Sequence, residues 1–280
     1  MTRADARKTA RQQLRGAGVD NAAAECDWLL CKALACSHTE LLLSLADAVP
    51  SEACAALDGY IQRRCAGEPV QYILQEWDFC GLSFDVGAGV LIPRPETEIL
   101  AETACKIAAR MTHPLVVDLC AGTGCIGLTV AARVPQARVV LVEKSAAALT
   151  FLRTNAQRLT HGNATLLQGD ILADSFPQIP HIDLLLSNPP YIPTGELPTL
   201  QREVQREPKL ALDGGDDGLL FYRVLAEMWA SRVLQDGQVL LELGDEQYPP
   251  VAALFAAQGY AVEGLADHAG QTRFLRGVRG

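Results

Sequence analysis

The sequence predicts an α/β fold, in which a mostly parallel sheet with an antiparallel edge strand follows a small helical bundle and a β-hairpin. Three observations predict it. Residues 1–70 are rich in Ala, Leu and Arg, with apolar residues at helical spacing. From Leu115 onward, short apolar runs alternate with helical stretches, a pattern typical of parallel sheets. Near the C-terminus, the apolar runs 261–265 and 272–275 are joined by a short connection, which favours an antiparallel pair.

This pattern divides the chain into three expected parts. Residues 1–70 form the helical domain, which holds no catalytic constellation and serves either as a stabilising appendage or in partner recognition. Residues 71–95 form a β-hairpin linker, in which strand-forming residues such as Tyr72 and Ile73 precede Gly81. Residues 96–280 form the large α/β domain.

Composition limits the classes of partner. The 280 residues include 24 basic and 33 acidic ones, a net charge of −9 that argues against tight, sequence-independent nucleic-acid binding. No apolar run resembles a signal peptide or a membrane helix, so we expect a cytoplasmic protein without membrane contact. The nine cysteines form no C-x-x-C pair and the histidines are dispersed, so we expect reduced thiols and no bound metal.

A loop of small residues follows the first apolar run of the large domain. Its residues are Cys120, Ala121, Gly122, Thr123 and Gly124. A strand, a tight loop and a helix N-terminus bring backbone close to a ligand. The next apolar run ends in Glu143, about twenty residues later, where a carboxylate can accept from a ribose hydroxyl. The pairing favours a bound nucleoside. The loop lacks the six-residue dinucleotide fingerprint and the Lys-Ser/Thr of a triphosphate loop.

Two further polar segments each follow an apolar run. Asp170 and Ile171 lie at a corner after the run 165–168, where an adenine amine could meet the carboxylate; a turn-forming Asp is the alternative. The run 184–186 leads to Asn188, Pro189, Pro190 and Tyr191. The prolines stop strand pairing, so the tip is displayed at the strand's carboxyl end, where open α/β sheets bind ligands. The Asn188 side chain and the Pro189 carbonyl form an acceptor pair suited to an NH2 group, and Tyr191 adds a flat face. An ordinary turn is the plainer alternative.

Together, Asp118-x-x-x-Gly122-x-Gly124, the acidic end of the next run and Asn-Pro-Pro-Tyr resemble the class I S-adenosylmethionine-dependent methyltransferases, whose sheet is Rossmann-like. More narrowly, the chain resembles the peptide chain release factor N5-glutamine methyltransferases. This resemblance extends from about Gly67 to Arg273 and rests on the segments Gly67-Glu-Pro69, Phe79-x-Gly81-Leu82, Leu91-Ile-Pro-Arg-Pro-Glu-Thr-Glu98, Asn188-Pro-Pro-Tyr-Ile192, Glu207-Pro208, Ala211-Leu212, Asp217-Gly-Leu219, Tyr222-Arg223, Leu241-Glu-Leu-Gly244, Gln247, Gly270-Gln271 and Arg273.

The resemblance implies transfer of a methyl group from S-adenosyl-L-methionine to the glutamine amide nitrogen (N5) in the Gly-Gly-Gln loop of class 1 release factors. S-adenosyl-L-homocysteine is the product, and translation termination is modulated. Asn188, Pro189, Pro190 and Tyr191 would be catalytic. Residues 120–124 would border the methionine part of the cofactor, Glu143 the ribose, and Asp170 and Ile171 the adenine, with Asn188 between cofactor and substrate. The helical domain would recognise the release factor, and a monomer without direct nucleic-acid binding is expected.

Two positions depart from the family pattern, because Cys120 and Gln75 stand where glycine is usual. An N6-adenine methyltransferase of DNA or RNA is an alternative, since an exocyclic amine suits the same acceptor pair, but the acidic composition counts against it. A catalytically silent S-adenosylmethionine-binding scaffold is the other alternative, against which the intact Asn188–Tyr191 tip counts.

Overall fold

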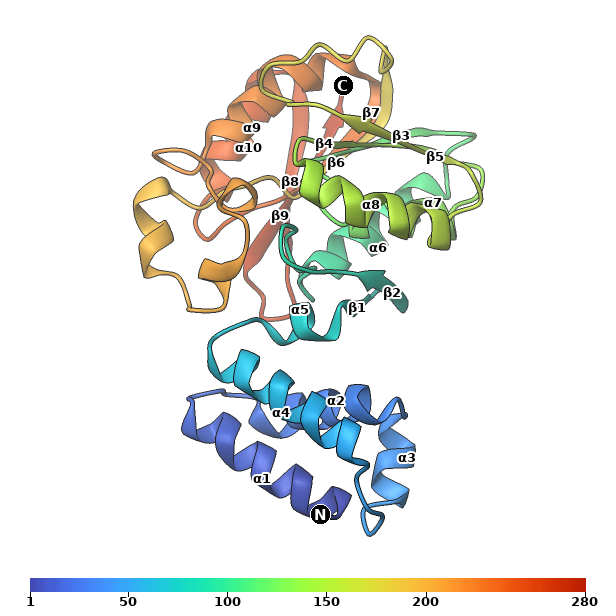
Figure 1. Cartoon of the computed structure of the whole chain (residues 1–280). Helices are drawn as coiled ribbons and strands as arrows, with labels where there is room; N and C mark the ends of the chain where they lie inside the picture. Colours follow the sequence, from blue (N-terminus) through green and yellow to red (C-terminus); the bar gives the residue numbers. More distant parts are fainter. The chain divides into compact units, whose positions relative to one another are not determined.

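The structure is a computed structural model that describes residues 1–280. The chain forms two compact units, residues 1–76 with 201–206 and residues 77–200 with 207–280. The first contains the helices at the blue end of the chain, and the second contains the sheet (Figure 1). None of the helices is both long and apolar enough to cross a membrane.

The helical unit is built from five helices: α1 (Arg3–Gly16), α2 (Ala22–Leu34), α3 (His38–Leu43), α4 (Ser51–Cys65) and α5 (Val70–Leu74). α1 and α3 each begin with a capping box, in which the side chain of Thr2 or Ser37 accepts from a backbone N–H three residues later. Leu14, Leu29 and Leu41 are fully buried in the shared apolar core.

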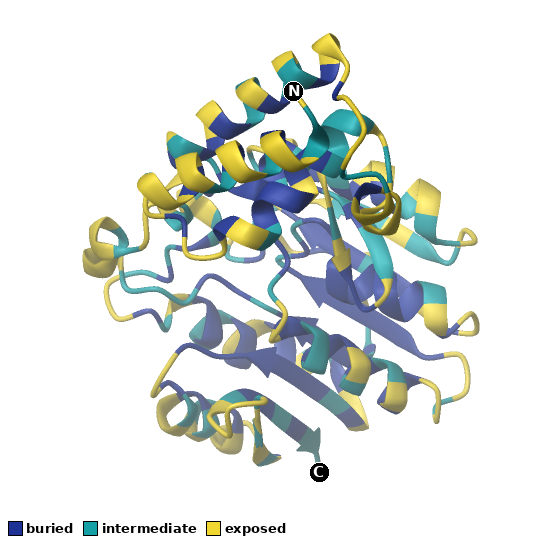
Figure 2. Cartoon of the chain, turned by 90° about the horizontal axis from the view of Figure 1, so that it is seen from below, coloured by how far each residue is buried: buried dark blue, intermediate teal, exposed yellow.

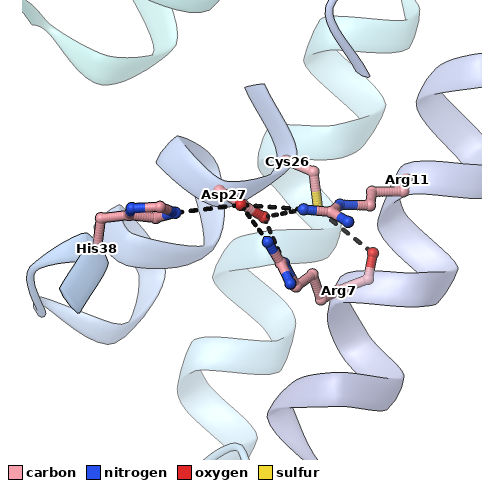
Figure 3. A network of polar contacts seen from close by, with 5 residues as sticks. All are labelled: Arg7, Arg11, Cys26, Asp27 and His38. Atoms are coloured by element: carbon pink, nitrogen blue, oxygen red, sulfur yellow. Dashed lines mark hydrogen bonds and ion pairs between the residues drawn. The ribbon is translucent and has the colours of Figure 1, made fainter. Parts of the chain in front are cut away.

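A buried carboxylate ties α1 to α2 (Figure 3). Both oxygens of Asp27 accept hydrogen bonds from Arg7, at 2.7 and 2.6 Å, and Arg11 donates at 2.9 Å. His38 Nε2 lies 3.3 Å from Asp27 Oδ2. Burial alone would raise the pKa of Asp27, but the hydrogen bonds from Arg7 and Arg11 more than offset this effect, so the pKa is lowered.

A second ion pair joins a distant segment to the same unit. Arg64 of α4 is 6% exposed and donates to Glu25 of α2, which is also buried. Its Nη1 donates to Glu203 Oε1 at 2.8 Å. Glu203 directly precedes η2 (Val204–Arg206), so this bond joins residues 201–206 to the helical unit to which they belong.

The connection between helix and hairpin departs from expectation at its start. Tyr72 and Ile73, expected among the strand-forming residues, lie in α5 and are buried. Pro69 starts this helical turn with φ −54°, and Gln75 ends it in the left-handed region with φ 65°. The hairpin itself consists of β1 (Glu76–Phe79) and β2 (Leu82–Asp85).

The large unit is organised around a seven-stranded sheet of order β5-β4-β3-β6-β7-β9-β8. Its elements are α6 (Thr97–Ala108), β3 (Leu115–Leu119), α7 (Cys125–Arg133), β4 (Arg138–Glu143), α8 (Ala146–Leu159), β5 (Ala164–Gln168), β6 (Ile182–Ser187), η1 (Thr194–Thr199), η3 (Lys209–Ala211), α9 (Leu220–Val224), η4 (Leu225–Trp229), η5 (Ala230–Arg232), β7 (Val233–Glu242), α10 (Tyr248–Ala257), β8 (Tyr260–Ala266) and β9 (Thr272–Arg279). The strands from β5 to β7 pair in parallel, and β9 pairs antiparallel with β7 and β8. The predicted α/β fold with an antiparallel edge is confirmed.

Alternate residues of the central strands face two separate apolar layers. Val116 and Leu184 belong to the layer formed with α6, α7 and α8, whereas Val117 and Leu185 belong to the layer formed with α9 and α10. Because helices cover both faces, the central strands are buried along their length, as the dark blue arrows of Figure 2 show. The carboxyl ends of β3, β4 and β6 therefore meet at one edge, where the chain leaves the core.

Candidate active site

A cavity of about 890 Å³, part of it open to solvent, opens at this edge of the sheet. It is lined by residues of the large unit alone. Of the residues singled out from the sequence, the lining includes Cys120, Ala121, Gly122, Thr123, Glu143, Asp170, Ile171, Asn188 and Pro190. Gly124, Pro189 and Tyr191 are not part of it.

The loop after β3 is shaped by left-handed backbone. Cys120, Gly122 and Gly124 have φ values of 62°, 56° and 83°. At Gly124, a Cβ would also lie 2.7 Å from Leu128 Cδ1, so only glycine fits there. Cys120 is strained by its Cβ in this conformation, a cost of about 1 kcal/mol that glycine would avoid. Cysteine in place of the family's usual glycine therefore lowers the stability of the loop.

Glu143 closes the loop from the end of β4. Its Oε2 accepts from the Gly122 N–H at 2.8 Å and its Oε1 from the Ser145 N–H at 2.6 Å. Burial raises the pKa of this carboxyl, and these hydrogen bonds counteract the rise. A carboxylate offers about four lone-pair positions. Glu143 can thus hold the loop and still accept from a ligand hydroxyl in the cavity.

The corner after β5 combines an apolar and a charged side chain. Ile171 is 3% exposed and packs in the apolar layer of α9 and α10 while lining the cavity. Asp170 accepts from the Leu172 N–H at 3.0 Å and pairs with Lys144 at 2.7 Å. Part of the hydrogen-bonding capacity of the Asp170 carboxylate is thus used within the protein, and Ile171 gives the cavity an apolar surface.

Asn188 lies directly after β6, which is held to β3 by a hydrogen bond from Ser187 Oγ to the Leu119 carbonyl at 2.7 Å. The backbone beyond it is fixed by Gln247, whose Nε2 donates to the Tyr191 carbonyl at 2.9 Å. Burial raises the pKa of Tyr191 to about 12, so its ring is a neutral face at physiological pH.

The structure adds residues that sequence reasoning missed. Thr97 lines the cavity beside Asn188, whose Nδ2 lies 3.4 Å from Thr97 Oγ1. From the sequence alone, Arg94 is either an exposed linker arginine or a contact for an acidic group. In the structure it pairs with Glu207, which also accepts from the Ile92 N–H at 2.9 Å. Both residues lie within Pro-Arg-Pro-Glu-Thr-Glu, but no spacing along the chain indicates their partners.

Comparison with known proteins places the chain in a family. The family model described as "PrmC N-terminal domain" matches residues 5–74, and "Methyltransferase small domain" matches residues 79–215. The release factor glutamine methyltransferase of Geobacter sulfurreducens is 40% identical over 252 residues, covering 89% of this chain and 87% of that protein. The chain belongs to the release factor glutamine methyltransferase family.

The chain is also similar to one further curated protein and to one solved structure. The 4-amino-L-phenylalanine/4-methylamino-L-phenylalanine methyltransferase of Streptomyces pristinaespiralis is 39% identical over 267 residues, covering 92% of this chain and 88% of that protein. A methyltransferase structure from Pyrococcus furiosus has a TM-score of 0.53 at 16% identity, covering 80% and 99% of the two chains, and shares the fold. As a member of the release factor glutamine methyltransferase family, the chain is a class I methyltransferase, which implies use of S-adenosylmethionine.

Proposed function

We propose that the enzyme transfers a methyl group from S-adenosyl-L-methionine to the glutamine N5 atom in the Gly-Gly-Gln loop of class 1 release factors. Translation termination is modulated as a result. The observation that carries the proposal is the Asn188 amide, which lines the cavity at the end of β6 in a chain of this family. On this proposal, the enzyme acts in the cytoplasm, as a monomer, on a protein and not on nucleic acid.

The residues around the cavity fit the cofactor. The left-handed loop from Cys120 to Gly124 brings backbone toward the methionine part. Glu143 retains acceptor capacity for the ribose hydroxyls. Ile171 packs against the adenine, with Asp170 near its amine. When bound, S-adenosylmethionine supplies an electrophilic methyl group on a positively charged sulfur.

The enzyme's task is to make a weak nucleophile reactive. The lone pair of an amide nitrogen is delocalised, so the nitrogen must be held in an attacking orientation. The Asn188 side-chain oxygen and the Pro189 carbonyl accept the two N–H bonds of the substrate amide and stabilise positive charge as it develops on nitrogen. Pro190 keeps the tip out of the strand ladder, and Tyr191 packs on the amide plane. The proton leaves to solvent after transfer.

We further propose that residues 1–70 recognise the body of the release factor, that residues 71–95 are the linker, and that residues 96–280 carry the chemistry. The match of residues 5–74 to a family-specific N-terminal model supports this division of labour. Two apolar residues of α3, Leu42 and Leu43, are 44% and 84% exposed and are available for a protein contact.

The test is methyl transfer from labelled S-adenosylmethionine, offered in parallel to five candidate substrates. These are an intact class 1 release factor, the same factor with its loop glutamine replaced, free 4-amino-L-phenylalanine, and unmethylated DNA and RNA. Label on the intact factor alone is expected. Label on the free amine would favour the activity named for the Streptomyces relative, which shares 39% identity. Label on nucleic acid would contradict the choice of a protein substrate.

Replacement of Asn188 separates chemistry from cofactor binding. We expect Asn188→Ala to lower kcat by about a hundredfold, the loss typical of one preorganised transition-state contact. The Kd for S-adenosylmethionine should change less than about threefold, since backbone and Glu143 carry most of that binding. Equal losses in kcat and cofactor affinity would show that Asn188 serves the cofactor alone.

A further inference from the structure

Two buried polar residues of the large unit meet behind Asn188, although they are 145 residues apart in the sequence. Thr97 is the first residue of α6, and Glu242 is the last residue of β7. They are 1% and 2% exposed. Thr97 Oγ1 donates to Glu242 Oε2 at 2.6 Å, and Asn188 Nδ2 lies 3.4 Å from the same Thr97 oxygen.

The chemistry of these groups fixes the direction of the chain of hydrogen bonds. An ionised carboxylate only accepts, and a threonine hydroxyl has a single proton. When Glu242 is ionised, Thr97 gives that proton to it, so the Thr97 oxygen can only accept from Asn188. The NH2 group of Asn188 must then face Thr97, and its carbonyl oxygen is left for the cavity.

We propose that Thr97 and Glu242 are positioning residues, which hold the Asn188 amide with its oxygen toward the substrate N–H. This inference rests on the proposed function, in which that oxygen accepts from the glutamine amide. If the Asn188 amide were flipped, its NH2 group would face the NH2 group of the substrate glutamine. Two donors would then meet, and the substrate nitrogen would no longer be held in its attacking orientation. The buried carboxylate of Glu242 fixes the direction of both hydrogen bonds, from Asn188 to Thr97 and from Thr97 to Glu242. We call this pair of hydrogen bonds the relay.

The surroundings of Glu242 indicate why its ionised form depends on the hydrogen bond from Thr97. Burial raises its pKa to about 7, with a further rise from Glu96, while Thr97, Arg273 and Arg94 lower it. Burying a carboxylate with few partners costs stability, and an apolar residue of similar volume would be neutral or better. The Tyr222 hydroxyl donates to the backbone carbonyl of Glu242 at 2.8 Å, so it fixes the strand end and leaves the side chain to Thr97.

The first test compares Thr97→Val with Thr97→Ser at pH 8, where Glu242 is mostly ionised. Valine keeps the shape of the side chain and removes the hydroxyl, whereas serine keeps the hydroxyl. We expect Thr97→Val to lower kcat on the release factor about tenfold, and Thr97→Ser to stay within about threefold of wild type. The Kd for S-adenosylmethionine, measured by calorimetry, should stay within about threefold of wild type in both.

The second test uses Glu242→Met, which removes the buried charge but keeps Thr97. The Thr97 proton is then free to donate to the Asn188 oxygen, so we expect about a tenfold loss of kcat in a protein at least as stable as wild type. Because both residues act through Asn188, the Thr97→Val/Glu242→Met variant should be no slower than the slower single variant.

The outcomes separate this inference from the proposed function. If wild type fails to methylate the release factor, the proposed function fails. If wild type is active and Thr97→Val matches it, or if the double variant shows multiplied losses of about a hundredfold, the relay is wrong while the proposed function stands. Loss of cofactor binding in Thr97→Val alone would assign the residue to the cofactor and also overturn the relay.

Discussion

Asn155 of α8 connects the hairpin to the loop of the cavity, and its replacement should destabilise the large unit. The side chain is fully buried and makes three hydrogen bonds with backbone groups, besides a longer one that it accepts from Arg158 at 3.5 Å. Its Oδ1 accepts from the Asp85 N–H at 2.7 Å, and its Nδ2 donates to the carbonyls of Asp85 at 3.2 Å and Thr123 at 3.0 Å. In Asn155→Ala, these three backbone groups lose their partner. At about 1 kcal/mol for each lost hydrogen bond, we expect the free energy of unfolding to fall by about 3 kcal/mol.

The assay is urea denaturation followed by tryptophan fluorescence in a Trp28→Phe background. Of the three tryptophans, this leaves Trp77 and Trp229, both in the large unit, so the signal reports that unit. Thr154→Ala is the matched control, because this exposed neighbour bonds only within its own helix and should change stability by less than about 0.5 kcal/mol. A loss below about 1 kcal/mol in Asn155→Ala would refute the reasoning, since water would then be replacing the side chain.

Two other predictions concern buried charges. Burial raises the pKa of Asp118 to about 7 from its usual 3.8, so the folded state holds a proton that the unfolded chain releases, and stability falls as pH rises between these values. Wild type should lose about 3 kcal/mol between pH 4 and pH 7 relative to Asp118→Asn in urea titrations, and parallel pH profiles would contradict this. Arg64→Met leaves Glu25 buried without its cation, so the helical unit should lose about 3 kcal/mol or more. The measurement is urea denaturation followed by the fluorescence of Trp28, which lies in the helical unit, in a Trp77→Phe/Trp229→Phe background; an unchanged midpoint would show that Glu25 relaxes into solvent.

The fold was predictable wherever the signal is local. Apolar runs of strand length bounded by turn residues predicted the parallel strands, and the short connection after residue 265 predicted the antiparallel pair β8 and β9, which the structure confirms. The helical region that begins with α9 is less regular than a single helix. It continues as the π-helical segment Leu225–Trp229 and a short 3-10 turn, and β7 already begins at Val233. Leu225, Ala226 and Trp229 are buried in the apolar layer beneath the sheet, and such long-range contacts leave no periodic pattern in the sequence of one segment.

In the candidate site, too, only the features with a local signal in the sequence could be predicted. Residues that follow strands, such as Glu143 and Asn188, were expected at one edge because parallel strands end together. The partners of Thr97 and Arg94 were not predictable, since each bond spans more than a hundred residues of sequence. Cys120 and Gln75 were predictable only in part. Both replace a usual glycine, and both have positive φ, so the physical reason for that glycine became visible only with the backbone.

The position of β9 has a consequence for how the protein is made. β9 leaves the ribosome after every other strand, yet it lies between β7 and β8. Until it emerges, β7 exposes an open edge and β8 has no neighbour to pair with. The nascent chain therefore carries an unpaired, aggregation-prone edge until β9 emerges.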